Sequence, residues 1–316
     1  MRRRIKILYF IPNLAMGGTE RQLLLMMRML PARFDPVLCV YHDSVFYDQE
    51  LPAGQPRHVL GCPRMDLRGL RRLTEIIRAE APDIVHSYRD KANLWARLAA
   101  LRAGAPVIVS SCRNRMMELH HLLLERPLAR RCDAVLTNSV GVRHELVHWA
   151  RVDPGKIHVI HNILEPELFR PPAPAERRDA RRRWGLADDQ LGLLLPGRIG
   201  LQKHQLGLLL AVDELRRAGR WPRRAVLLLA GRRRDQRIAK LVDRLLARPG
   251  LREQVRFLDA QHDMRSLYWA SDVLVMPSLF EGLSNAALEG CACGLPAIVS
   301  RAVNPDGIVL HGRTGL

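Results

Sequence analysis

Short apolar runs recur along the whole chain, and stretches with helical spacing of apolar side chains separate them. Gln205–Ala218 and Arg237–Ala247 are two of these helical stretches. Strand-like runs that alternate with helices are typical of α/β proteins with parallel sheets. We therefore expect one parallel sheet in each half of the chain. The expected strands are Ile5–Ile11, Val37–Tyr41, Ile84–His86, Val107–Ser110, Ala134–Thr137, Ile157–Ile160, Leu191–Leu195, Ala225–Ala230, Val255–Leu258, Val273–Met276 and Ala297–Ser300.

A proline-rich segment, Pro171-Pro172-Ala173-Pro174-Ala175, separates the two halves. This composition favours a semi-rigid connector, so we place the domain boundary near residue 170. The chain of 316 residues is long enough for two domains, each with its own core. The prediction is two Rossmann-like, doubly wound α/β domains, 1–170 and 171–316, that face each other across a cleft. In such sheets ligands bind outside the carboxyl ends of the strands.

Two carboxylates, Glu281 and Glu289, flank a segment with the pattern of a loop entering a helix. Ser284 or Asn285 can cap the start of that helix, where unpaired N–H groups bind anions such as a diphosphate. At about 1.5 Å rise per residue, Glu289 lies roughly 6–8 Å further along, about the reach from a diphosphate to a ribose. Carboxylates repel phosphate, so both are better suited to accept hydrogen bonds from sugar hydroxyls. This geometry fits a nucleotide-sugar.

Two cations, Arg198 and Lys203, lie in the loop that follows the expected strand Leu191–Leu195. When a sugar–phosphate bond breaks, negative charge develops on the departing diphosphate. Arg198 can donate two parallel hydrogen bonds to phosphate oxygens, and Lys203 can act as a point charge. The two cations would neutralise the leaving group without magnesium.

Each of these patterns also has a purely structural interpretation. Two glutamates eight residues apart are common on solvated helix faces, and two cations are ordinary in an arginine-rich chain. The context favours a site, because the buried run Val273–Met276 precedes the carboxylates and Gly294 is suited to end their helix.

Several longer motifs occur together in this chain. They are Pro277–Asn285 with Glu289, Gly294-Leu295-Pro296 and Gly312–Gly315, and upstream Gly17–Glu20, Asn138-Ser139, Val159–Asn162, Phe169, Gly197-Arg198 and Lys203. With these motifs, which span nearly its whole length, the chain resembles glycosyltransferase family 4, whose members are retaining enzymes of the GT-B architecture. The resemblance implies a nucleoside-diphosphate sugar as substrate, with no cofactor and no metal.

The resemblance also implies a role for each candidate residue. Glu281 is expected to hold hydroxyls of the donor sugar, and Glu289 those of the ribose. Arg198 and Lys203 would act on the diphosphate, so Glu281 and these two cations are the expected catalytic residues. Retention in the family is usually described as front-face attack through an oxocarbenium-like state. The remaining donor-binding candidates are Gly18, Gly282, Leu283 and Ser284.

The chain departs from the family pattern in three places. In the segment 301–307 relatives commonly carry a glycine pair and a glutamate, for which Asp306 would substitute with a shifted register. Some relatives carry a histidine after the strand that is here Val107–Ser110, where this chain has Cys112-Arg113. His86 ends another expected strand and is either a polar residue of the site or a buried histidine with its hydrogen bonds satisfied. Relatives usually continue beyond the point that corresponds to Leu316 through further helices, so we expect a truncated second domain.

The net charge of +18 raises the question of a polyanionic partner. Only five of the 50 basic residues are lysines, and the arginine clusters lack interleaved aromatic residues, so nucleic-acid binding is not expected. Docking on an anionic membrane surface is the stronger hypothesis, because each basic residue near such a surface contributes about 1 kcal/mol. The alternative is a solvated basic face.

Other features of the sequence concern location and metals. No run reaches the roughly 20 apolar residues that span a bilayer. The basic start, Met1–Arg4, leads into an expected strand rather than a signal peptide. The six cysteines and twelve histidines show no metal-ligand spacing, and we expect reduced, mostly packed cysteines. We predict a cytoplasmic protein, attached peripherally to the inner face of the membrane.

The sequence thus leads to one hypothesis and two alternatives. The hypothesis is a metal-independent, hexosyltransferase-type enzyme that transfers a sugar from a nucleotide-sugar donor to a glycan or lipid-linked acceptor. Its setting would be bacterial polysaccharide or lipopolysaccharide assembly. The alternatives are a nucleotide-sugar epimerase or hydrolase on the same fold, and a non-catalytic relative that binds glycan or membrane.

Overall fold

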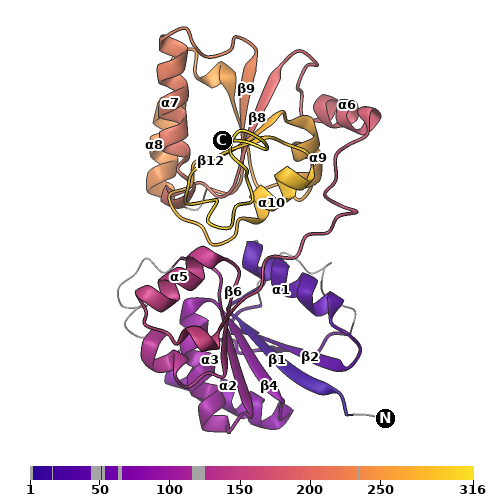
Figure 1. Ribbon diagram of the computed structural model, residues 1–316, viewed down its shortest axis with the longest axis vertical. Helices are drawn as coiled ribbons and strands as arrows, with labels where there is room; N and C mark the ends of the chain where they lie inside the picture. Colours follow the sequence, from indigo (N-terminus) through magenta and orange to yellow (C-terminus); the bar gives the residue numbers. More distant parts are fainter. Residues whose placement is uncertain are drawn as a thin grey trace. The chain divides into compact units, whose positions relative to one another are not determined.

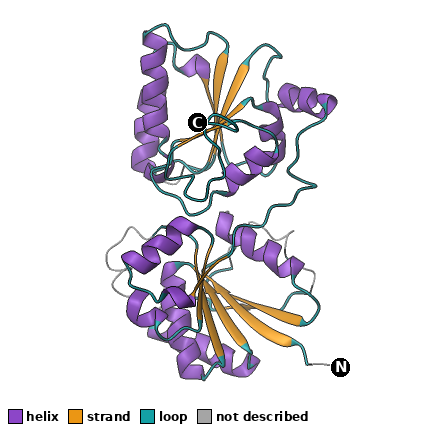
Figure 2. Ribbon diagram, viewed as in Figure 1, coloured by secondary structure: helices purple, strands orange, loops and turns teal. Residues whose placement is uncertain are grey.

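The computed structural model describes residues 3–15, 17–43, 51, 54–62, 66–115, 125–233 and 235–316. Its contacts divide the chain into two compact units, Met1–Ile163 and Leu164–Leu316. Each unit contains a parallel sheet with helices on both faces (Figures 1 and 2). The division lies slightly before the boundary that the sequence placed near residue 170.

The N-terminal unit alternates strands and helices along the chain. Its described elements are β1 (Ile5–Ile11), α1 (Gly18–Met29), β2 (Phe34–Val40), β3 (Arg57–Val59), α2 (Leu67–Glu80), β4 (Ile84–Tyr88), α3 (Asp90–Ala103), β5 (Val107–Cys112), β6 (Ala134–Thr137), α5 (Val140–His148) and β7 (Ile157–Val159). The strands form a seven-stranded sheet in the order β3-β2-β1-β4-β5-β6-β7. The chain therefore changes direction across the sheet between β1 and β4.

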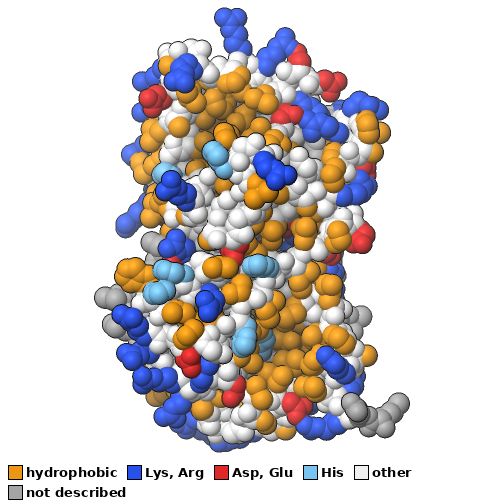
Figure 3. All heavy atoms as spheres, viewed as in Figure 1, with side chains coloured by type: hydrophobic (Ala, Val, Ile, Leu, Met, Phe, Trp, Pro, Cys, Tyr) orange, Lys and Arg blue, Asp and Glu red, His pale blue; other side chains and the backbone are white. Residues whose placement is uncertain are grey.

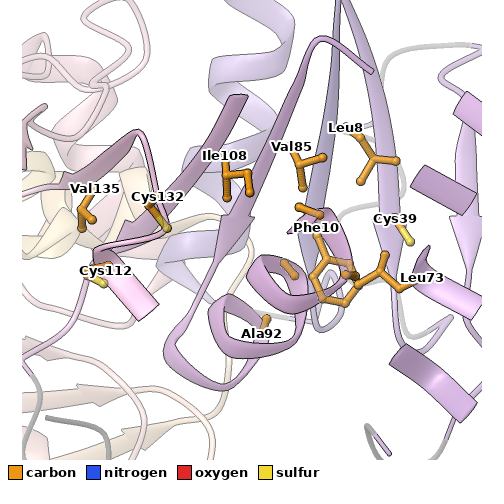
Figure 4. Packing of buried hydrophobic residues seen from close by; sticks show 14 of the residues in the cluster. Leu8, Phe10, Cys39, Leu73, Val85, Ala92, Ile108, Cys112, Cys132 and Val135 are labelled. Carbon is orange, nitrogen blue, oxygen red and sulfur yellow. The ribbon is translucent and has the colours of Figure 1, made fainter. Parts of the chain in front are cut away.

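Alternate side chains of β1 enter two separate cores, one on each face of the sheet. Leu8 and Phe10 pack with Leu73 of α2 and with the alanines of α3 (Figure 4). Tyr9 and Ile11 pack on the other face with Leu23 and neighbouring residues of α1. Successive side chains of a strand point to opposite faces, so a strand covered on both sides is apolar throughout.

The C-terminal unit repeats this design with a smaller sheet. Its described elements are α6 (Pro174–Arg183), β8 (Leu191–Pro196), the 3₁₀ turn Leu201–Lys203, α7 (Gln205–Arg217), β9 (Ala225–Ala230), α8 (Gln236–Leu246), β10 (Val255–Leu258), α9 (Met264–Ala270), β11 (Val273–Met276), α10 (Asn285–Ala292) and β12 (Ala297–Val299). The five-stranded sheet has the order β10-β9-β8-β11-β12. Its direction changes between β8 and β11.

Two cores again share the central strands of this sheet. Leu227 and Leu229 of β9 pack with residues of α7 and α8, such as Leu209. Leu228 faces the opposite core, which contains Leu267 of α9 and Ala287 of α10. The alternating burial explains why β9 is uniformly apolar in the sequence.

The proline-rich segment leads into a helix of the C-terminal unit. Pro174 occupies the first turn of α6, where its missing N–H has no helical partner to lose. Glu176 accepts a hydrogen bond from the backbone N–H of Ala173 and pairs with Arg170 through two bonds of 2.8 and 2.7 Å. These contacts make the segment the start of a helix within the C-terminal unit.

A buried histidine lies in the middle of β4, which continues past it to Tyr88. His86 is 5% exposed, and its Nε2 lies 2.9 Å from Ser111 Oγ. Its ring contacts the rings of Tyr9 and Tyr88, with centroids 5.4 and 4.5 Å away. Burial disfavours the charged ring and lowers the pKa of His86 to about 3, with a further contribution from the charge of Arg113. His86 is therefore neutral at pH 7.

The substitution Leu228→Ala tests the core of the C-terminal sheet. Leu228 is fully buried, so we expect the free energy of unfolding to fall by about 2–5 kcal/mol through lost apolar transfer and a residual cavity. Urea denaturation followed by circular dichroism measures the change. The matched control is Leu241→Ala on α8. Leu241 is 41% exposed, so its truncation should lower the free energy of unfolding by only about 0.5 kcal/mol. Equal losses in both variants would contradict the assignment of this core.

The depressed pKa of His86 predicts a loss of stability in acid. Between its folded pKa of about 3 and an unfolded value of about 6.5, only the unfolded chain binds the proton, so stability falls as pH drops. Between pH 7 and pH 5.5 this group should lower the free energy of unfolding of the wild type by about 1 kcal/mol. His86→Gln should remove that difference in urea unfolding at the two pH values, whereas His148→Gln at an exposed position should keep it. Parallel pH dependences in all three proteins would refute the buried neutral state.

Candidate functional site

The loops that follow β8 and β11 lie where the direction of the C-terminal sheet changes. The first loop, residues 197–204, carries Arg198 and Lys203, and the second, residues 277–284, carries Glu281. Because β8 and β11 are hydrogen-bonded neighbours, their carboxyl ends bring these loops together. The fold thus gathers three predicted site residues at the position where doubly wound sheets bind ligands.

Lys203 and Glu281 form an ion pair between the two loops. Lys203 Nζ lies 2.5 Å from Glu281 Oε1, and the side chains are only 14% and 9% exposed. The ammonium and the carboxylate are therefore in direct contact. Opposite charges attract more strongly in such a shielded place than in water, and removing one partner leaves the other buried and uncompensated. The sequence predicted both residues but not their pairing.

Two glycines allow the loop after β8 to pack closely. Gly197 (φ +143°) and Gly231 (φ +158°) both adopt backbone conformations that side chains disfavour. A Cβ on Gly231 would collide with the carbonyl of Gly197, and a Cβ on Gly197 would lie 2.9 Å from Cε of Lys203. The glycines therefore let the lysine side chain lie against its own loop.

Two glutamines hold the loops in place, and the sequence analysis did not identify either as a site residue. Gln202 donates to the carbonyl of Phe280 (3.1 Å), and its own carbonyl accepts from the N–H of Leu279 (2.9 Å). Its Oε1 accepts from Arg198 Nη2 at 2.7 Å, which orients this exposed guanidinium. Gln205, 1% exposed, donates to the carbonyl of Arg198 at 3.0 Å. Amide side chains within a charged loop are the signal that would have identified them.

The loop after β11 leads into α10 as the sequence predicted. Ser284 is the N-cap, and its Oγ accepts a hydrogen bond from the N–H of Ala287 at 3.4 Å. Gly282 and Leu283 are buried beside it. Gly294 (φ +87°) follows the end of the helix in the left-handed conformation expected of a terminating glycine.

Glu289 lies in the middle of α10 and is only 7% exposed. Its Oε2 accepts a hydrogen bond of 2.9 Å from the hydroxyl of Tyr268, which belongs to α9. Tyr268 was not singled out in the sequence, because an aromatic residue in an apolar helix usually indicates core packing. The hydrogen bond fixes the orientation of the carboxylate.

Gly18 and His86, the two remaining predicted site residues, belong to the N-terminal unit. Gly18 is exposed and is the first residue of α1, after the N-cap Gly17. His86 is the buried neutral histidine described above, which agrees with the structural alternative for this residue. The roles assigned to both stay predictions.

The structure also bears on metals, thiols and membrane spans. Within the described parts of the chain, no three His, Cys, Asp or Glu side chains come together as a metal-binding group. All six cysteines are free thiols. None of the described helices is both long enough and apolar enough to cross a bilayer.

Two protein-family models match the chain, one in each unit. Residues 16–168 match the model described as Glycosyltransferase Family 4. Residues 190–316 match the model described as Glycosyl transferases group 1.

Two curated relatives illustrate the similarity. The D-inositol 3-phosphate glycosyltransferase of Stackebrandtia nassauensis is 32% identical over 266 residues, which cover 76% of this chain and 59% of the relative. The UDP-Gal:alpha-D-GlcNAc-diphosphoundecaprenol alpha-1,3-galactosyltransferase of Escherichia coli is 29% identical over 246 residues, covering 74% and 62%. The chain thus spans about three fifths of the length of these relatives.

Solved structures share the fold over almost the whole chain. HepE of Anabaena, solved in complex with UDP-glucose, superposes with a TM-score of 0.85 at 21% identity over 99% of this chain and 85% of HepE. WaaG, a glycosyltransferase involved in lipopolysaccharide biosynthesis, gives 0.72 at 14% identity over 98% and 85%. These structures show that the chain has the GT-B fold. The family models and the curated relatives show that it belongs to glycosyltransferase family 4.

Proposed function

We propose that the protein transfers a sugar from a nucleoside diphosphate to a glycan or lipid-linked acceptor, with retention of the anomeric configuration. The observation that carries the proposal is the Lys203–Glu281 ion pair at the β8/β11 edge, beside the capped start of α10. A cation and a carboxylate held together at a ligand-binding edge suit a substrate with an anionic part and a hydroxyl-rich part. A nucleotide-sugar has both.

The two cations stabilise the leaving group in this proposal. As the sugar–phosphate bond breaks, its electron pair passes to the diphosphate, and Lys203 lies ready to receive that charge. Arg198, oriented by Gln202, donates hydrogen bonds to the diphosphate from an exposed position on the same loop. Fixed cations that meet developing charge lower the barrier without reorganisation, so we propose a metal-independent reaction. Activity that persists in excess EDTA would support this point.

The two carboxylates hold the neutral parts of the donor. Glu281 accepts hydrogen bonds from the hydroxyls of the sugar, and Glu289, oriented by Tyr268, accepts from the ribose. HepE was solved with UDP-glucose, and the relative from Escherichia coli is named for UDP-Gal. Uridine nucleotides are therefore the first donors to test.

The cellular setting is also part of the proposal. We place the protein in the assembly of bacterial surface polysaccharide or lipopolysaccharide, as the names of WaaG and the relative from Escherichia coli suggest. On the face shown in Figure 3, basic side chains are scattered over both units rather than gathered in one patch. The hypothesis of peripheral attachment to an anionic leaflet therefore rests on the net charge of +18 alone and stays a prediction.

Donor binding is the first test of this function. A ligand that binds only the folded state raises the melting temperature, so one of UDP-, GDP- or ADP-glucose should shift the melting curve. Glu289→Gln should weaken the binding of that donor about tenfold or more, because a charged group that accepts hydrogen bonds from the ribose hydroxyls is lost. Glu253→Gln, an exposed carboxylate elsewhere in the unit, is the control. The proposal fails if a cooperatively melting protein responds to no donor.

Product analysis with the donor that binds separates transfer from the two alternatives. A new glycoside that forms only with acceptor supports a transferase. Conversion of the donor without any acceptor indicates an epimerase or hydrolase. Donor binding without turnover in the presence of candidate acceptors indicates a non-catalytic relative.

The ion pair itself predicts a coupled effect on catalysis. Lys203→Met should lower kcat about 100-fold with a smaller change in donor affinity, since the cation acts mainly on charge that develops in the transition state. The double variant Lys203→Met/Glu281→Gln should lose less kcat than the product of the two single fold-losses, because the residues interact. Lys240→Met, at an exposed position on α8, is the control. Independent effects in the double-mutant cycle would argue against the pair as one catalytic unit.

A further inference from the structure

The chain passes from the N-terminal unit to the C-terminal unit at the peptide bond between Ile163 and Leu164. Just upstream, the chain after β7 is still held by the first unit, because the N–H of Ile160 donates to the carbonyl of Thr137 at 2.7 Å. Hinges between domains are usually a few residues at the ends of elements, which absorb changes in φ and ψ. The contacts on each side of this peptide bond therefore determine where such a hinge lies.

Gln22 clamps Ile163 with both ends of its side-chain amide. Its Nε2 donates to the carbonyl of Ile163 at 2.8 Å, and its Oε1 accepts from the N–H of Ile163 at 2.6 Å. The carbonyl of Ile163 and the N–H of Leu164 belong to one planar peptide group, so the clamp also holds that plane. The last residue of the N-terminal unit is thus fixed through its backbone.

The clamp has a rigid base. Gln22 belongs to α1 and is only 5% exposed. The next two residues of the helix, Leu23 and Leu24, are fully buried in the core that α1 shares with β1. An apolar side chain could occupy this position without the cost of burying an amide. The two hydrogen bonds to Ile163 are what the amide contributes here.

The C-terminal unit holds the chain directly after the clamp. The side chain of Leu164 packs against the core cluster of this unit that contains Phe169. Phe169 is 5% exposed, and its N–H donates to the carbonyl of Glu165 at 2.9 Å. Trp269 Nε1 donates to the carbonyl of Arg170 at 2.8 Å. Consecutive residues, Ile163 and Leu164, are therefore held by different units.

We propose that Gln22 confines the hinge between the two units to the backbone of Leu164. The clamp fixes the peptide plane before Leu164, and the side chain of Leu164 packs in the other unit, so φ and ψ of this residue are the torsions left for rotation. Without the clamp, Ile163 joins the hinge, and the next hold upstream is the 3.2 Å hydrogen bond from Asn138 Nδ2 to Asn162 Oδ1. The proposal goes beyond the transferase function and does not depend on it.

The spread of distances between the units tests the proposal on the full chain. Nitroxide labels at Leu67→Cys on α2 and Lys240→Cys on α8, both exposed positions, report this spread by double electron–electron resonance. Cys62→Ser and Cys291→Ser remove the two half-buried thiols, and the other four cysteines are buried. Hydrogen exchange of the Ile163 amide, followed by NMR, reports on the clamp itself.

Two variants of Gln22 separate the halves of the clamp. Gln22→Met removes both hydrogen bonds and keeps the length of the side chain. Gln22→Glu keeps an acceptor for the N–H of Ile163 but places a second oxygen against its carbonyl, and it provides a second test should the methionine variant fail to fold. The control is Thr74→Val on α2, which removes a buried hydrogen bond of 2.8 Å to the carbonyl of Leu70 in the same unit.

Both Gln22 variants should broaden the distance distribution about 1.4-fold, because the free torsions about double and independent rotations add as squares. The Ile163 amide should exchange about tenfold faster in Gln22→Met, since one hydrogen bond is lost, and near the wild-type rate in Gln22→Glu. Thr74→Val should change neither quantity. The proposal is overturned if either folded Gln22 variant keeps the wild-type width, if Thr74→Val broadens the distribution as much, or if the Ile163 amide is unprotected in wild type.

Discussion

Parallel strand pairing is the constraint on which the candidate site depends, because it places the carboxyl ends of all strands at one edge of each sheet. β8 and β11 are neighbours although α7, β9, α8, β10 and α9 separate them in the chain. This pairing brings Lys203 to Glu281 and lets Gln202 reach the backbone of the second loop. The pairing of β1 with β4 does the same for Glu20 and Arg89. Hydrogen bonds of the backbone thus determine which charges meet.

Strands with long apolar runs were predictable, and strands with polar residues were not. Ala225–Ala230 matches β9 because both faces of that strand are buried. β2 begins at Phe34 rather than Val37, since Asp35 and Pro36 interrupt the apolar pattern while the backbone continues to pair with β1. β3 was missed because an edge strand of three residues, two of them Arg and His, leaves no apolar pattern.

The candidate site was predictable residue by residue but not as a network. Residue type and local spacing pointed to Glu281, Glu289 and Lys203, because a charge near a helix start has a chemical meaning that does not depend on the rest of the fold. The partners depend on contacts between distant segments, as with Tyr268 and Glu289. The left-handed backbone of Arg89 is likewise a product of the assembled sheet, and nothing in the sequence around it signals that conformation.

The hydrophobic clusters found among the described residues each lie within one unit. The clusters around β1 and β4 draw on residues before the division at Ile163, and those around β8 and β9 draw on residues after it. A gene segment that encodes one unit can therefore be exchanged without repacking the core of the other. Such separate cores also let substitutions accumulate inside one unit while the packing of the other is inherited intact.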